Sequence, residues 1–215
     1  NLARARFSCR AFRPDPVPEA VTRRILDTAR KAASWSNVQP WSVVVTRPET
    51  TAALSAALLA AEAEYPGVHA NLPYPERFTG VHLARRRAVG FGLYAALGIA
   101  REDRAARHAH HLNNFRFFGA PHVALVFMPA ELGPYGALDV GGFVQAFLFA
   151  ARAQGVDTLA QAALAQHAAV VRQLAGMGDE MAFLCGISFG YADPEHAANR
   201  FRATRATVDE IARFV

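Results

Sequence analysis

A helix predicted over residues 138–154 constrains the fold more than any other stretch, because it is apolar on nearly every side. The large side chains that leave it little polar face are Val140, Phe143, Val144, Phe147, Leu148 and Phe149. A helix of this kind in a soluble protein must be buried centrally, either in a large core or between subunits. Because 215 residues form a core of limited size, the sequence favours burial between the two copies of a homodimer.

Composition indicates one domain that covers residues 1–215. A hydrophobic content of 52% suffices for one well-filled core. Apolar periodicity predicts helices over residues 18–33, 49–64, 81–97 and 101–114 and strands over residues 41–45, 123–128 and 181–185. A turn is predicted at residues 132–136, and an apolar last element over residues 208–215 is expected to dock on the body of the protein.

Three loops are candidates for ligand contact. Residues 65–80 contain three prolines and two glycines, and long loops in compact domains are often lids or substrate contacts. Residues 155–163 carry small side chains that let a backbone approach a ligand, and the alternative is a plain turn between helices. Residues 33–41 join a helix to a strand and carry amides, hydroxyls and indoles. Such groups can recognise the edge of a flat heterocycle, and the alternative is an ordinary turn in which Trp41 anchors the core.

Basic residues exceed acidic ones, 23 against 18, and Lys31 is the only lysine. A chain so rich in arginine suits phosphate recognition, because the guanidinium fork pairs with phosphate oxygens, although codon bias also explains it. Arg6, Ser8 and Arg10 place three anion-binding groups within five residues, which suits one phosphate. The basic residues are spread without aromatic interleaving, so we expect no nucleic-acid partner.

Other patterns give weaker signals. Cys9 and Cys185 form no CxxC motif, which fits a reducing cytoplasm, and no stretch is apolar for long enough to predict a membrane helix. His108 and His111 share a helix face, but no carboxylate or cysteine lies at ligand spacing, so we expect no metal site. Gly90 and Gly92 are interpreted as packing residues, because the spacing of a dinucleotide fingerprint is incomplete.

A GxSxG motif occupies residues 186–190, as in the nucleophile elbow of α/β-hydrolases. The elbow must turn from a strand into a helix, whereas Tyr191 to Pro194 break the chain here. We therefore interpret Ser188 as a strand residue rather than a nucleophile.

Several sequence blocks occur in a characteristic order along the chain. The first blocks are Arg6 to Phe12 with Pro16 to Pro18, and Ser34 to Trp41. Later blocks are residues 117–121, 155–158 with 161–163, 185–187 with 190–191, and 199–202 with Arg205. In order and spacing, these blocks together resemble the FMN-dependent nitroreductase family. Tyr74 to Arg77 and residues 101–103 further resemble a branch whose members reduce nitroaromatic compounds. The likeness runs nearly from end to end.

The resemblance implies an α+β fold with a central, mainly antiparallel sheet flanked by helices, and an intertwined homodimer with two FMN sites at its interface. The positions that match phosphate and ribityl contacts are Arg6, Ser8, Arg10 and Arg205, with a backbone contact from Phe7. The positions that match the loop facing the flavin ring, partly from the second subunit, are Ser34, Trp35, Ser36, Asn37 and Gln39. The segment beside the N5 edge of the flavin matches Ala160, Gln161, Ala162 and Ala163.

Some positions depart from the family pattern. Trp35 stands where the family often has glycine, and Ala160 where proline is common. Phe7 replaces an arginine or histidine, and Ala203 replaces a second basic residue, for which Arg202 can substitute. These departures concern the phosphate site and the space above the ring.

The resemblance also implies a ping-pong reaction. NADH or NADPH passes hydride to the flavin and leaves, and a small aromatic acceptor, a nitroaromatic or a quinone, then takes its place in the same pocket. Because the flavin carries the chemistry, no catalytic side chain is expected. The alternatives are another flavoenzyme on the same scaffold, such as a dehydrogenase or a flavin-processing enzyme, and a non-catalytic flavin-binding module.

Overall fold

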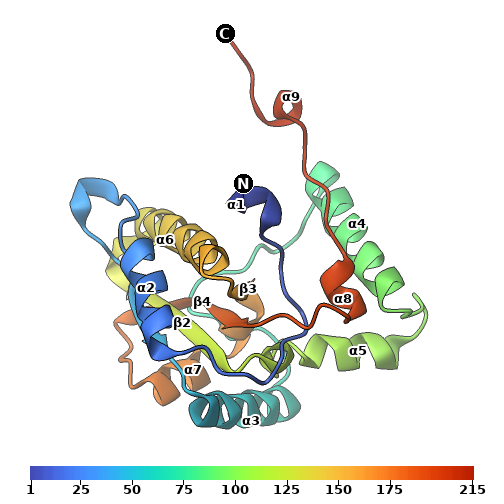
Figure 1. The fold of residues 1–215 in the computed structure, drawn as a ribbon, viewed down its shortest axis with the longest axis horizontal. Coiled ribbons are helices and arrows are strands. Elements are labelled where there is room, and N and C mark those ends of the chain that lie inside the picture. The colour runs from blue at the N-terminus through green and yellow to red at the C-terminus, as the bar shows by residue number, and fades with distance from the viewer.

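The computed structural model describes residues 1–215 and is built around one four-stranded antiparallel sheet (Figure 1). The strands are β1 (Ser42–Val45), β2 (His122–Pro129), β3 (Asp157–Gln161) and β4 (Met181–Gly190), and they are ordered β1-β2-β4-β3 across the sheet. Every neighbouring pair is antiparallel. The predicted α+β architecture is confirmed.

Strand β2 divides the apolar interior into two cores. Its side chains alternate, because successive residues of a strand point to opposite faces of the sheet. Ala124 and Val126 belong to the core beneath two helices, α2 (Glu19–Ala29) and α6 (Gly133–Ala153). Leu125 and Phe127 belong to the core beneath α3 (Pro48–Glu64), α7 (Ala168–Ala175) and the short 3₁₀ helix η4 (Ala162–His167). The sheet therefore has a helical layer on each face (Figure 1).

Helix α6 differs from its prediction in two ways. It begins at Gly133 rather than after a turn at residues 132–136, because Pro134 lies in the first turn, where its missing N–H costs no hydrogen bond. Only one of its faces is buried within the chain, and Tyr135 and Leu138 on the other face are 64% and 69% exposed. A single copy therefore does not enclose this helix.

Helices α4 (Gly80–Ala96) and α5 (Arg104–Leu112) lie to the side of the sheet layers (Figure 1). The packing role predicted for Gly92 is confirmed, since a Cβ atom there would lie 2.6 Å from the ring of Phe201. The same role is wrong for Gly90, where a Cβ would meet nothing within 4 Å.

The remaining elements are short. The helices are α1 (Leu2–Ala5), α8 (Ala197–Arg200) and α9 (Val208–Ile211), and the 3₁₀ turns are η1 (Trp35–Asn37), η2 (Phe117–Gly119) and η3 (Ala130–Leu132). None of the helices is long and apolar enough to cross a membrane.

Three further predictions need correction. The connection expected at residues 155–163 contains strand β3, which pairs with β4 along its length. Strand β4 continues past the predicted end at residue 185 as far as Gly190. Residues 207–215, the C-terminal arm, do not bury their apolar side chains on their own chain, although Glu210 pairs with Arg85 of α4 at 3.4 Å. The arm extends away from the body (Figure 1), and Phe214 in it is 86% exposed.

Candidate functional site

Residues 6–12, the N-terminal segment, run beside the outer strand β3. Ser8 forms a parallel bridge with Thr158, and the Cys9 amide donates to the Thr158 carbonyl at 3.0 Å. Residues two apart in an extended segment point to the same side. This pairing therefore places Arg6, Ser8 and Arg10 along one side of the segment, at the edge of the sheet.

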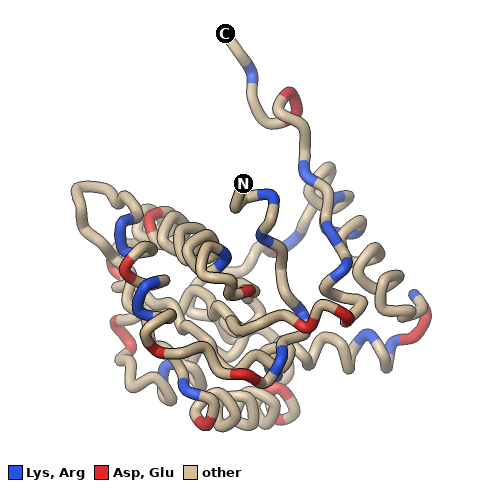
Figure 2. The backbone as a smooth tube through the Cα atoms, viewed as in Figure 1, with Lys and Arg blue, Asp and Glu red and all other residues tan.

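Residues 199–205, the C-terminal segment, bring two more arginines close to the N-terminal segment. The charge of Arg205 lies close enough to Arg6 to lower the pKa of Arg6, after the larger effect of burial. Burial also lowers the pKa of Arg10. Arg202 places its guanidinium 4.1 Å from the centre of the Phe7 ring. Figure 2 shows basic positions along both segments.

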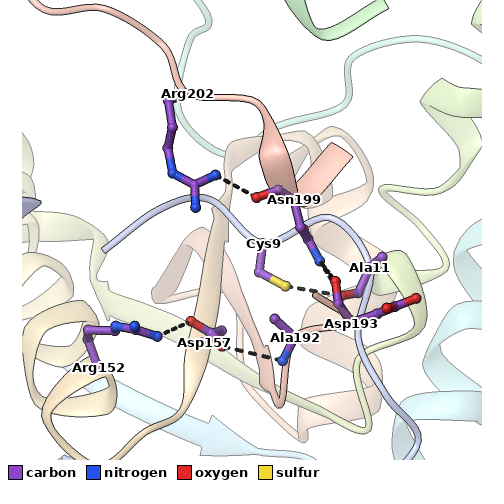
Figure 3. Close-up of polar contacts among 8 residues, drawn as sticks. All are labelled: Cys9, Ala11, Arg152, Asp157, Ala192, Asp193, Asn199 and Arg202. Atoms are coloured by element: carbon purple, nitrogen blue, oxygen red, sulfur yellow. Dashed lines mark hydrogen bonds and ion pairs between the residues drawn. The ribbon is translucent and has the colours of Figure 1, made fainter. Parts of the chain in front are cut away.

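The four arginines Arg6, Arg10, Arg202 and Arg205, called here the arginine cluster, form no ion pair with any carboxylate. Asp157, whose charge reaches Cys9, instead pairs with Arg152 at 2.8 Å (Figure 3). Like charges held together without a counter-ion destabilise one another, and a buried cation needs a partner. The cluster is therefore suited to an anion from outside the chain.

The end of β3 lies next to the arginine cluster and is held by a buried polar network. The Gln161 side chain accepts a hydrogen bond from the Ser188 hydroxyl and donates to the Asn114 carbonyl at 3.0 Å. Both Gln161 and Ser188 are buried. Between Leu159 and Gln161, which are buried, Ala160 is exposed, so the backbone of β3 is accessible at this residue.

The loop of residues 65–80 reaches this same junction. The Tyr74 hydroxyl donates to the Ala162 carbonyl, and burial raises the pKa of Tyr74. Sequence reasoning assigned no site role to Asn114, Ser188 or Tyr74. The sequence held a signal for two of them: the family-like block of residues 74–77 contains Tyr74, and the GxSxG match contains Ser188.

The loop of residues 34–39 lies elsewhere in the chain, at the start of α6. The Trp35 amide donates to Asp139 at 3.0 Å, and the Trp35 ring meets Tyr135 edge to face. Ser36, Asn37 and Gln39 of the loop adopt positive φ angles of 50°, 59° and 51°. Such angles are uncommon outside glycine, and strained loops of this kind occur most often at functional sites.

The structure therefore does not bring all the predicted site residues together within one chain. The arginine cluster and residues 160–163 lie by β3, which follows the end of α6, whereas the strained loop lies by the beginning of α6 (Figure 1). A helix rises about 1.5 Å per residue, so Asp139 and Ala153 are separated by about 20 Å. One small ligand at β3 can contact this loop only if a second copy supplies it.

The remaining candidate groups have other environments. His110 packs against Tyr94 and Phe118, and burial, followed by the charge of Arg10, lowers its pKa. No three side chains of the metal-binding types gather closely enough to hold an ion. Ser188 is fully buried within β4, so its interpretation as a strand residue is confirmed.

Comparison with known proteins decides the family. The model of the nitroreductase family matches residues 3–191. The chain belongs to the nitroreductase family. The fold and the motif blocks along this nitroreductase chain therefore have a common origin in that family.

Curated relatives extend over almost the whole nitroreductase chain. Nitroreductase NfnB of Mycolicibacterium smegmatis is 41% identical over 215 residues, which are 100% of this chain and 91% of that protein. The 4-nitrobenzoate reductase of Pseudomonas putida is 33% identical over 98% of this chain and 92% of its own length.

Solved nitroreductase structures agree with this fold. The crystal structure of the FMN-dependent nitroreductase NfnB from Mycobacterium smegmatis, in complex with NADPH, has a TM-score of 0.95 at 41% identity. The match covers 100% of this chain and 96% of that one. The expected nitroreductase fold is thereby confirmed over the full length of residues 1–215.

Proposed function

We propose that this protein is an FMN-dependent oxidoreductase that takes hydride from NADH or NADPH and reduces nitroaromatic or quinone-type acceptors. The observation that carries the proposal is the arginine cluster, four cations from the two terminal segments with no carboxylate partner, close to β3, where Ala160 is exposed. The relatives support it, since they include a 4-nitrobenzoate reductase and an FMN-dependent nitroreductase in complex with NADPH.

The residues present fit the phosphate of FMN. Burial disfavours the charged form of Arg10, and a phosphate dianion beside it would compensate that cost. Guanidinium groups bind phosphate oxygens through paired hydrogen bonds. Arg6 and Arg205 lie close enough for their charges to interact, and Ser8 lies between Arg6 and Arg10 in the N-terminal segment. Arg202 takes the place of the basic residue missing at Ala203, and its guanidinium makes a cation–π contact with the Phe7 ring.

The backbone of residues 160–163 fits the flavin ring. Its side chains are alanine except for Gln161, which points into the buried network with Ser188 and Asn114. A flat ring can therefore approach the backbone amides at the end of β3. When bound, FMN supplies hydride acceptance and transfer, and the chain orients it and excludes water.

The second part of the ring site comes from another copy of the chain. We infer a homodimer in which residues 34–39 of the second copy face the ring bound at β3, and supply the amides of Asn37 and Gln39 with Ser34, Trp35 and Ser36. The exposed outer face of α6 and the C-terminal arm provide apolar surface for that contact. Residues 1–215 then act as one FMN-binding domain. We expect it to work in the cytoplasm, where nicotinamide donors are made.

The test is a direct one. Purified protein should be yellow, should be bleached anaerobically by NADPH or NADH, and should oxidise the same donor steadily when 4-nitrobenzoate is added. Removal of FMN should abolish turnover, and added FMN, but not riboflavin, should restore it, because only FMN carries the phosphate that the arginine cluster binds. Protein that takes up no flavin, or flavin that stays oxidised under excess donor, would contradict the proposal.

A further inference from the structure

Asn199 is a buried residue of α8 that uses its whole side chain to join the two terminal segments (Figure 3). Its Oδ1 atom accepts a hydrogen bond from the Arg10 amide at 2.7 Å. Its Nδ2 group donates to the Ala11 carbonyl at 2.8 Å and to the Asp193 carbonyl at 2.8 Å. An asparagine amide has two donors and one acceptor oxygen, so all three functions are engaged.

The backbone of Asn199 contacts Arg202, one of the two cluster arginines in the C-terminal segment. Its carbonyl accepts a hydrogen bond from Nη1 of Arg202 at 2.5 Å (Figure 3). Arg202 in turn lies over the ring of Phe7 in the N-terminal segment. A shift of this one residue would therefore move Arg10 and Arg202 relative to each other.

Other hydrogen bonds join residues 11–13 to residues 191–193, between β4 and α8, and preserve the fold. The Asp193 amide donates to the Ala11 carbonyl at 3.0 Å, and the Arg13 amide donates to the Tyr191 carbonyl at 2.8 Å. These bonds lie beyond the arginines, at residues 11–13. Asn199 is the contact that reaches Arg10 itself, so its effect is expected on the geometry of the cluster more than on the fold.

We propose that Asn199 is a positioning residue for the phosphate end of the cofactor. It sets the separation between the arginines of residues 6–10 and those of residues 202–205, so that both groups reach the same phosphate. Charge-assisted hydrogen bonds depend on short, well-aligned contacts, and a displaced guanidinium loses most of its contribution. This inference rests on the proposed FMN function and deepens it.

The test compares two flavins that differ in the phosphate. Apoprotein of the wild type, Asn199→Ala, Asn199→Asp and Arg200→Ala is titrated with FMN and with riboflavin, and the dissociation constants are read from quenching of flavin fluorescence. Asn199→Ala should weaken FMN binding about tenfold, the loss expected for a misplaced charged hydrogen bond. It should change riboflavin binding less than twofold, so the preference for FMN falls.

Asn199→Asp is the second variant. It keeps the size of the side chain and the acceptor for the Arg10 amide, but its carboxylate faces the two carbonyl groups that the amide contacted. It should therefore also lower the preference for FMN. If Asn199→Ala does not fold, the flavin preference of Asn199→Asp tests the positioning role of Asn199. Arg200→Ala is the matched control on the same helix, because the Arg200 side chain is exposed and pairs with Glu195. It should leave both constants unchanged.

The outcomes separate the two claims. If the wild type binds neither flavin, the proposed function fails. If the wild type prefers FMN and the Asn199 variants keep that preference, whether both flavins weaken equally or neither changes, Asn199 has a purely structural role and only this inference is overturned.

Discussion

Cys9 lies between two of the site residues, Ser8 and Arg10, and its side chain is fully buried. Burial raises the pKa of the Cys9 thiol to about 12 from an ordinary value of 9.0. The hydrogen bond from Sγ to the Ala11 carbonyl, at 3.2 Å, requires the protonated thiol. A neutral thiol is therefore built into the segment that carries the arginines.

This thiol makes stability depend on pH in the alkaline range. Its pKa is higher in the folded state, so the unfolded chain binds fewer protons above pH 9 and stability falls as the pH rises from 9 towards 12. At pH 10 the Cys9 thiol should lower the free energy of unfolding by about 1 kcal/mol relative to its value at neutral pH. Urea unfolding at pH 7 and pH 10 measures the loss, and Cys9→Ala should show a smaller one. An equal loss in both proteins would show that Cys9 ionises normally.

At the scale of elements, helix α4 is connected to the site through α8. The ring of Phe201, which follows α8, packs against the bare backbone of Gly92. Arg202 comes next in the chain. The fit between α4 and Phe201 therefore helps to fix where the C-terminal segment begins, and a Cβ at residue 92 would force the Phe201 ring to shift.

The two glycines of α4 form a matched pair of test positions. Gly90→Ala should stabilise the protein by up to about 1 kcal/mol, because alanine favours a helix and nothing lies near the new methyl group. Gly92→Ala gains the same propensity but must displace Phe201, and overpacking typically costs about 1–3 kcal/mol. Urea unfolding of both variants gives the comparison. Equal stabilisation by the two substitutions would show that Phe201 does not constrain α4.

At the scale of the whole molecule, the chain presents apolar surfaces that it does not cover itself. The C-terminal arm exposes Val208, Ile211 and Phe214 by 61%, 71% and 86%. The outer face of α6 and the loop with Trp35 add further exposed aromatic groups. Exposed apolar groups gathered on such elements often mark an interface, which agrees with the inferred homodimer.

Replacing the apolar side chains of the arm should weaken the dimer. The triple variant Val208→Ser, Ile211→Ser and Phe214→Ser removes side chains that each contribute about 1.5–3 kcal/mol when buried. We therefore expect the dissociation constant of the dimer to rise at least about a hundredfold. Sedimentation velocity over a concentration series measures it. The control, Asp209→Ser with Arg213→Ser, changes the polar positions of the same arm and should leave the dimer intact. A wild-type protein that is monomeric at all concentrations would contradict the inferred assembly.

Local sequence patterns predicted much of the fold. Helices α2 and α3 and strands β1 and β2 were recognisable because periodicity and β-branched runs are properties of a few neighbouring residues. The spacing of Arg6, Ser8 and Arg10 marked an anion site for the same reason, and a broken context identified Ser188 as a strand residue. The family motifs placed these pieces within one fold.

Other features depend on partners far away in the chain. Residues 157–161 carry only one large apolar side chain, Leu159, and become a strand only because the edge of β4 is there to pair with them. Asn199 contacts Arg10 across 189 positions of sequence, and neither residue predicts the other. The positions of the arm and of residues 34–39 relative to the arginine cluster were also invisible in the sequence.

The sequence by itself indicated which residues carry anion-binding groups and where most of the helices and strands lie, because these properties follow from each side chain and its near neighbours. Only the tertiary structure decided that arginines of the two terminal segments lie near one another without a carboxylate partner, and that Asn199 contacts both Arg10 and Arg202. Such arrangements arise from hydrogen bonds and packing between segments that only folding brings together.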